Sequence, residues 1–219
     1  MVDDKDHLII DELTNAIDYL KKLQFFLENI NIEFRWKWIS ICYTSAFYSM
    51  VIADLEGGNF ENVLDQNWLK NRIEKKVKEL EKKGIEITQV DRLKIREECL
   101  HEKNAQLINF KSAFKMFQKS EWMGKYFYGD KLHPSDEEKS GIEKIQEWRN
   151  YFVHFIPCTL GLHKLDILLP IKNSFRLFKY AFLEADPTVY WIKDEIDLNT
   201  VKEIITKIEN IIDKEINNI

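Results

Sequence analysis

The chain has 219 residues, of which only 7 are Gly and 4 are Pro. So few turn-forming residues exclude collagen-like chains, flexible linkers and a β-sandwich, which needs a turn about every 8 to 12 residues. The formal net charge of −5 predicts no general attraction to nucleic acid or to anionic membranes, while 45% hydrophobic residues suffice for a buried core. We expect one all-α domain covering residues 1–219.

The cysteines and the apolar segments predict a soluble, cytoplasmic protein. Cys42, Cys99 and Cys158 are widely separated and lack CxxC spacing, which indicates reduced thiols rather than disulfides or a zinc site. The first residues are acidic and do not resemble a signal peptide. The most apolar segment, 39–53, contains several hydroxyl residues and is too short to cross a bilayer. We expect no metal and no cofactor.

In the first half of the chain, apolar residues three and four apart predict helices over 6–30 and 34–55. The second is apolar on nearly every side, which is typical of a central helix. Segment 66–103 carries 11 Lys and Arg residues against 8 Asp and Glu, and Gly84 divides it into two helical stretches. We interpret it as a charged helical insertion. A further helix is expected over 105–119.

In the second half, residues 121–134 are expected to form a loop, because they contain two Gly and one Pro. Ser135 and Glu138 have the spacing of a capping box, which predicts a helix running to about residue 155. The next helix is expected over 166–185, with Pro170 in its first turn. Asn199 is expected to cap a last helix over 200–216. The result is a helical bundle of about six or seven helices.

The helix after Ser135 gathers side chains that can do chemistry. At about 100° per residue, Arg149 falls within an apolar arc formed by Ile142, Ile145, Phe152, Val153 and Ile156. A guanidinium in such an arc is unfavourable unless it is paired or lies at an interface. Asn150 and His154 lie four positions apart on the neighbouring polar arc. One short segment therefore offers a permanent cation, an amide and a group that titrates near neutral pH.

These groups suit cleavage of an RNA phosphodiester. His154 can move a proton to or from the 2′-hydroxyl or the leaving 5′-oxygen. Arg149 can stabilise the negative charge of the transition state, and Asn150 can orient the imidazole or hold a phosphate oxygen. The line formed by Lys111, Lys115 and Lys119 has helical spacing and is either a solvated surface or a track for the RNA backbone.

The Arg149–Asn150–His154 pattern resembles the HEPN superfamily, in which an Arg-x4-6-His motif lies on a helix. Segments 34–39, 55–59, 108–111 and 154–157 resemble a plasmid-type branch of that superfamily, so the resemblance covers most of the chain except 66–103. It implies a homodimer formed through the 135–156 helix and a metal-independent endoribonuclease site. It also implies a toxin or phage-defence effector, with an antitoxin or another regulatory protein as a partner. Ile156 stands where some HEPN toxins carry a modified Tyr.

Other interpretations stay open. Arg96 and His101 match the same Arg-x4-His spacing, but Glu97 follows the arginine and no apolar arc surrounds it, so we interpret that match as a coincidence. The first alternative to the ribonuclease is a catalytically inactive HEPN-like module for interaction or RNA binding. The second is an unrelated helical scaffold in which the pattern around Arg149 arose by chance.

Overall fold

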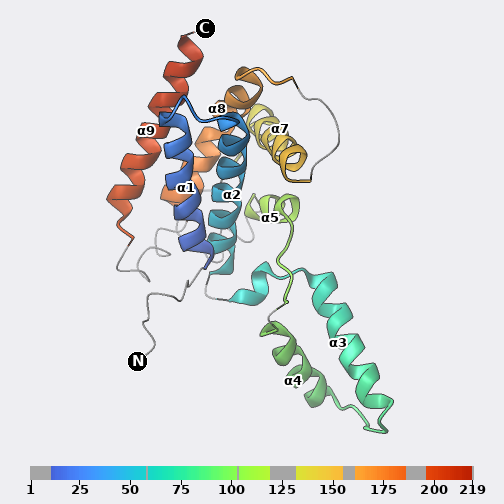
Figure 1. The fold of residues 1–219 in the computed structure, drawn as a ribbon. Coiled ribbons are helices and arrows are strands. Elements are labelled where there is room, and N and C mark those ends of the chain that lie inside the picture. The colour runs from blue at the N-terminus through green and yellow to red at the C-terminus, as the bar shows by residue number, and fades with distance from the viewer. Residues whose placement is uncertain are drawn as a thin grey trace, which may run out of the picture. The chain divides into compact units, whose positions relative to one another are not determined.

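The structure is a computed structural model, and it describes residues 11–57, 59–102, 104–118, 132–154, 161–185 and 196–218. Within these ranges the chain forms eight α-helices and no β-strand beyond one isolated bridge, between Leu64 and Leu107 (Figure 1). The helices are α1 (Glu12–Glu28), α2 (Arg35–Glu56), α3 (Gln66–Glu81), α4 (Gln89–Leu100), α5 (Phe110–Phe117), α7 (Asp136–Val153), α8 (Leu165–Tyr180) and α9 (Leu198–Asn217). The predicted all-α class is confirmed. Lys119, Ile156, Cys158 and most of the expected 121–134 loop lie outside the described residues.

The chain divides into two compact units. One comprises Met1–Asp54 together with Gln118–Ile219, and the other comprises Leu55–Phe117. The second unit contains the whole charged segment 66–103 that the sequence distinguishes.

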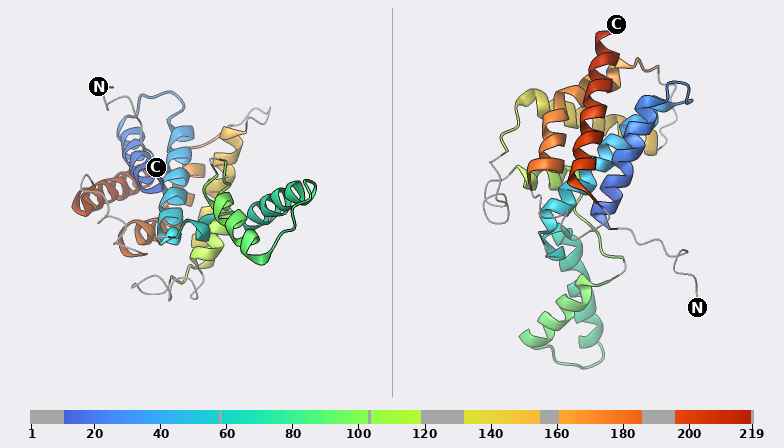
Figure 2. Two further views of the ribbon diagram at one scale, coloured as in Figure 1. Left: turned by 90° about the horizontal axis from the view of Figure 1, so that it is seen from below. Right: turned by 90° about the vertical axis from the view of Figure 1, so that its left-hand side faces the viewer.

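In the first unit, α8 contacts α7, α9 and α2 (Figures 1 and 2). Aromatic rings fill the contact with α2, where Phe178 stacks on Tyr43 with ring centroids 4.6 Å apart. The buried hydroxyl groups of Tyr43 and Ser174 lie 2.8 Å apart and share a hydrogen bond. Burial raises the pKa of the Tyr43 phenol above its usual range. On the other side of the unit, α1 packs against α9.

Helix α2 is apolar because it lies in the core. It is the one described helix long and apolar enough to cross a membrane, but 78% of its apolar window is buried inside the protein. That degree of burial is typical of the core helix of a soluble protein. The sequence expectation of a central helix over 34–55 is therefore correct. Its Cys42 is a buried free thiol, and burial raises its pKa to about 12.

The expected start of α7 is confirmed, whereas the cap of α9 and the position of Pro170 need correction. The Ser135 side chain accepts from the backbone N–H of Glu138, and the capping box at α7 is complete. The cap of α9 is Asp197 rather than Asn199, since its carboxylate accepts from the backbone N–H groups of residues 199 and 200. Pro170 lies in the second turn of α8, because that helix already begins at Leu165.

In the second unit, α3 and α4 form an antiparallel hairpin (Figure 2). Its small core consists of Leu69 and Val77 from α3 with Ile95 and Cys99 from α4. Gly84, in the turn between the helices, has a φ of +78°, a conformation that favours glycine.

Helix α5 begins five residues later than expected. The preceding segment pairs instead with residues 63–65, as Ile108 N donates to Val63 O at 2.8 Å and Asp65 N to Gln106 O at 2.8 Å. The backbone groups that a helix would use for itself are therefore bonded to a distant segment.

Candidate functional site

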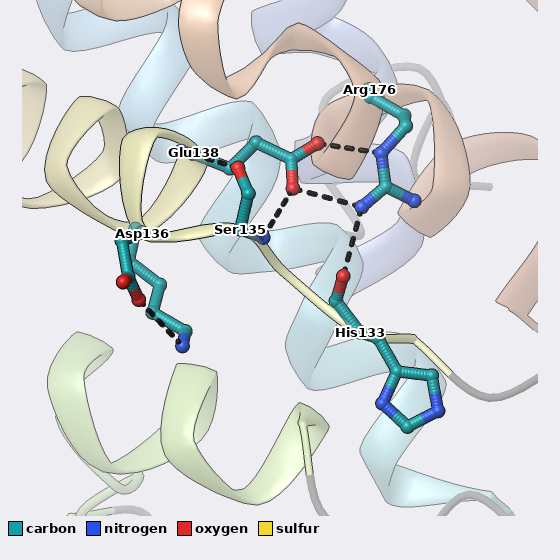
Figure 3. A network of polar contacts seen from close by, with 6 residues as sticks. His133, Ser135, Asp136, Glu138 and Arg176 are labelled. Atoms are coloured by element: carbon teal, nitrogen blue, oxygen red, sulfur yellow. Dashed lines mark hydrogen bonds and ion pairs between the residues drawn. The ribbon is translucent and has the colours of Figure 1, made fainter.

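The first turn of α7 is fixed to α8 by an ion pair that the sequence analysis did not anticipate (Figure 3). Arg176 binds both carboxylate oxygens of Glu138, Nε at 2.5 Å and Nη2 at 2.8 Å. Nη2 also donates to the backbone oxygen of His133 at 3.2 Å, and Ser135 N donates to Glu138 at 2.7 Å. The Arg176 guanidinium holds the pKa of Glu138 below its usual range. This network fixes where α7 starts.

The middle of α7 approaches α8 closely at Gly141. A β-carbon at this position would lie 2.7 Å from the backbone oxygen of Pro170 and 3.2 Å from the backbone nitrogen of Ser174. Backbone atoms of a packed helix cannot move aside as a flexible side chain can. The glycine therefore sets the distance between the two helices.

The C-terminal part of α7 is held by Trp148. Its indole Nε1 donates to the backbone oxygen of Asp166 at 2.9 Å. In an uninterrupted helix that carbonyl accepts from the N–H group four residues later, but this residue is Pro170, which has no N–H. Helix α8 therefore leaves one carbonyl without its helical donor, and α7 supplies the replacement.

The predicted site residues occupy the end of α7 that these contacts position. Arg149 is half-buried, and its Nη1 donates to Asn150 Oδ1 at 3.2 Å. Gln146 Nε2 donates to the same oxygen at 3.3 Å. His154 is the C-cap residue directly after the last helical residue, Val153: its backbone N–H donates to Asn150 O at 3.0 Å, and its side chain is exposed.

Two features of this arrangement bear on the expected chemistry. Both hydrogen bonds to the Asn150 side chain end on its Oδ1, one from Arg149 and one from Gln146, and none joins Asn150 to the His154 imidazole in the described part of the chain. Arg149 and His154 are five residues apart, which places their side chains about 140° apart around the helix axis. In the part of the chain that the structure describes, Arg149 forms no ion pair with a carboxylate.

The apolar arc around Arg149 is partly used inside the protomer. Ile142 and Ile145 are both at most 1% exposed, so they belong to the core and are not available to a second copy. Val153 is 44% exposed. The surface left for a dimer contact at this helix is therefore smaller than the sequence pattern suggests, and it is centred on Arg149 and Val153.

Two of the three predicted lysines, and the second Arg-x4-His match, lie in the second unit. Lys111 and Lys115 are exposed on α5, while Phe114 and Phe117 on the same helix are buried. The second Arg-x4-His match has a structural explanation, because Arg96 is paired with Glu61. His101 caps the C-terminus of α4 and is exposed.

Sequence reasoning missed three residues that shape the site. Gln146 lies four residues before Asn150, which is a spacing that predicts contact on a helix. Trp148 and Arg176 carried no comparable signal, because their partners lie 18 and 38 residues away in the sequence. Local sequence patterns do not predict contacts between residues so far apart in the chain.

No group of three or more His, Cys, Asp or Glu side chains that could hold a metal ion occurs among the described residues. Comparisons with models of protein families, with curated proteins and with solved structures found no match. The fold class is all-α, and the HEPN resemblance stays a prediction that depends on Arg149, Asn150 and His154.

Proposed function

We propose that the protein is a metal-independent endoribonuclease of HEPN type that acts as a cytoplasmic homodimer, in the role of a toxin or phage-defence effector. The observation that carries the proposal is the state of Arg149. Its cation is half-buried, and its one hydrogen-bond partner among the described residues is the neutral amide of Asn150. A guanidinium that has no counter-ion in the described part of the chain is available to a phosphate group, whose oxygens it binds in a bidentate manner.

The exposed His154 supplies the proton transfer. In the proposed reaction the 2′-hydroxyl loses its proton to an imidazole and its oxygen attacks phosphorus. The bond to the 5′-oxygen breaks, and that oxygen takes a proton from an imidazolium. The products are a 2′,3′-cyclic phosphate and a 5′-hydroxyl, so water is not consumed in this step. Arg149 stabilises the added negative charge of the transition state.

The geometry of α7 favours a site built from two copies. The reaction needs both a base and an acid, and two copies of the chain supply two His154 imidazoles for these roles. Arg149 and His154 also diverge around one helix axis, so a phosphate is held more easily between two α7 helices than on one. Val153 is the exposed apolar residue at this end of α7 and is the natural centre of the contact.

The test is cleavage of single-stranded RNA by the purified protein in EDTA. We expect His154→Ala to lower the rate at least 100-fold, which is the size of a typical acid–base contribution. His101→Ala is a matched control, because it removes the exposed histidine of the other Arg-x4-His match. Equal rates for His154→Ala and the wild type, with both proteins folded, would refute the proposal. A strictly monomeric, active protein would refute the two-copy site.

The inactive HEPN-like module remains the second candidate, and one observation favours it. Asn150 is engaged with Arg149 and Gln146, which leaves the His154 side chain without an orienting partner in the described part of the protomer. This reading predicts RNA binding that depends on Arg149 and no cleavage by any variant. A regulatory partner such as an antitoxin is compatible with either candidate.

A further inference from the structure

The two edges of the α3–α4 hairpin are built differently. One edge is closed by ion pairs between the helices: Arg72 Nε lies 2.6 Å from Glu102, and Lys76 Nζ lies 3.0 Å from Glu102 and 3.4 Å from Glu98. The hydrogen bond from Arg72 is the main reason that the pKa of Glu102 lies below its usual range. On this edge the charges of the two helices neutralise each other.

The opposite edge is open. It holds a groove of about 350 Å³ whose floor includes Leu69 and Ile73. Lys70 from α3 and Arg92 from α4 line its two walls. Both are exposed, and neither forms an ion pair with a carboxylate in the described part of the chain.

The remaining charges leave this groove cationic. Arg96 also lines it and is already paired with Glu61, and Glu74 is the one acidic residue in the lining. Since Glu61 neutralises Arg96, two cations that form no ion pair in the described part of the chain, Lys70 and Arg92, face the single carboxylate of Glu74. The Lys70 and Arg92 side chains come from different helices, so a negative group between them is bound from both sides.

We infer that this groove binds the backbone of single-stranded RNA, with phosphates between Lys70 and Arg92 and a base against the apolar floor. The inference rests on the proposed function for its choice of polyanion. The volume of the groove is near the lower limit of small-ligand sites, about 300 Å³, and suits a nucleotide in an extended strand. An acidic protein partner would have to bury about 800 Å² on each side for a stable complex, far more than this groove offers.

The experiment measures RNA binding by the full chain carrying His154→Ala, so that cleavage does not interfere. A labelled single-stranded oligonucleotide is titrated in EDTA, and fluorescence anisotropy is read at several salt concentrations. The groove variant is Lys70→Glu with Arg92→Glu. The control is Lys83→Glu with Lys94→Glu, which makes the same charge change at exposed positions of the same unit outside the groove lining.

We expect the groove variant to bind at least 10-fold more weakly near 100 mM salt, and the control to stay within about 3-fold of the parent. Each phosphate contact on a single strand adds about 0.7 to the salt slope, so losing two contacts lowers the slope by about 1.4. Similar losses in both variants, or none in the groove variant, would overturn the inference. So would equal competition by a glutamate peptide of matched charge.

The outcomes of this experiment distinguish a failure of the groove inference from a failure of the proposed function. Groove-dependent binding by a chain that never cleaves RNA refutes the nuclease and leaves the groove. Cleavage that needs His154 but does not depend on Lys70 and Arg92 refutes the groove and leaves the nuclease.

Discussion

The contact between α7 and α8 at Gly141 gives a prediction whose magnitude follows from the structure. Gly141→Ala places a β-carbon 2.7 Å from the Pro170 carbonyl oxygen. Alanine is favoured over glycine inside a helix by about 1 kcal/mol, and this gain opposes the clash. Overpacking a well-packed core costs about 1 to 3 kcal/mol, and here the cost lies in the upper part of that range, about 2 to 3 kcal/mol, because the obstructing atoms belong to the backbone of α8. We expect a net loss of about 1 to 2 kcal/mol.

For a chain of this size 1 kcal/mol shifts the melting temperature by about 2 to 4 °C, so Gly141→Ala should melt about 2 to 8 °C lower. Thermal unfolding followed by circular dichroism measures this directly. Gly161→Ala is the matched control, because a β-carbon there meets nothing within 4 Å. If Gly141→Ala melts at or above the wild-type temperature, α7 and α8 do not approach as described. The same variant should also impair RNA cleavage, because α7 carries Arg149.

Two further predictions concern contacts of α8. Since the ion pair with Arg176 lowers the pKa of Glu138, its stabilisation is complete above the unfolded pKa of about 4.3 and disappears as the pH falls through the folded value. Urea unfolding should show Glu138→Gln to be about 1 to 2 kcal/mol less stable at pH 7, with the gap closing towards pH 3; a constant gap would exclude the ionised pair as its cause. Ser174→Ala should be more destabilising than Tyr43→Phe, because it leaves the buried Tyr43 hydroxyl without its partner. In Tyr43→Phe, by contrast, the Ser174 hydroxyl keeps its hydrogen bond to the Pro170 carbonyl at 2.8 Å. The reverse order, measured by the same denaturation, would contradict the assigned hydrogen bond.

The parts of the fold that the sequence predicts well are those governed by local interactions. The capping box at Ser135, the break at Gly84 and the central position of α2 each depend on residues close together in the chain. The start of α5 was predicted five residues too early, because its N-terminal flank pairs with residues 63–65. A helical pattern does not reveal that competing partner.

The same distinction applies to the candidate site. Placement of Arg149 and Asn150 on one helix follows from sequence spacing and the structure has it so, whereas His154 is the C-cap residue directly after the end of α7. The hydrogen bond from Arg149 to Asn150 did not follow, because neighbouring side chains on a helix diverge and meet only when a long guanidinium folds back. Burial of Ile142 and Ile145 against the core depends on the tertiary packing of α7.

Pro170 couples two helices through a single carbonyl group. Pro170→Ala would restore an N–H group to α8, and that amide would then compete with the Trp148 indole for the oxygen of Asp166. Restoring this backbone hydrogen bond in α8 would therefore weaken the attachment of α7, which carries the candidate site residues. The contribution of Trp148 to stability therefore depends on the residue at position 170, because its indole bonds a carbonyl that Pro170 leaves without a helical donor. A stabilised variant of this protein should leave both unchanged.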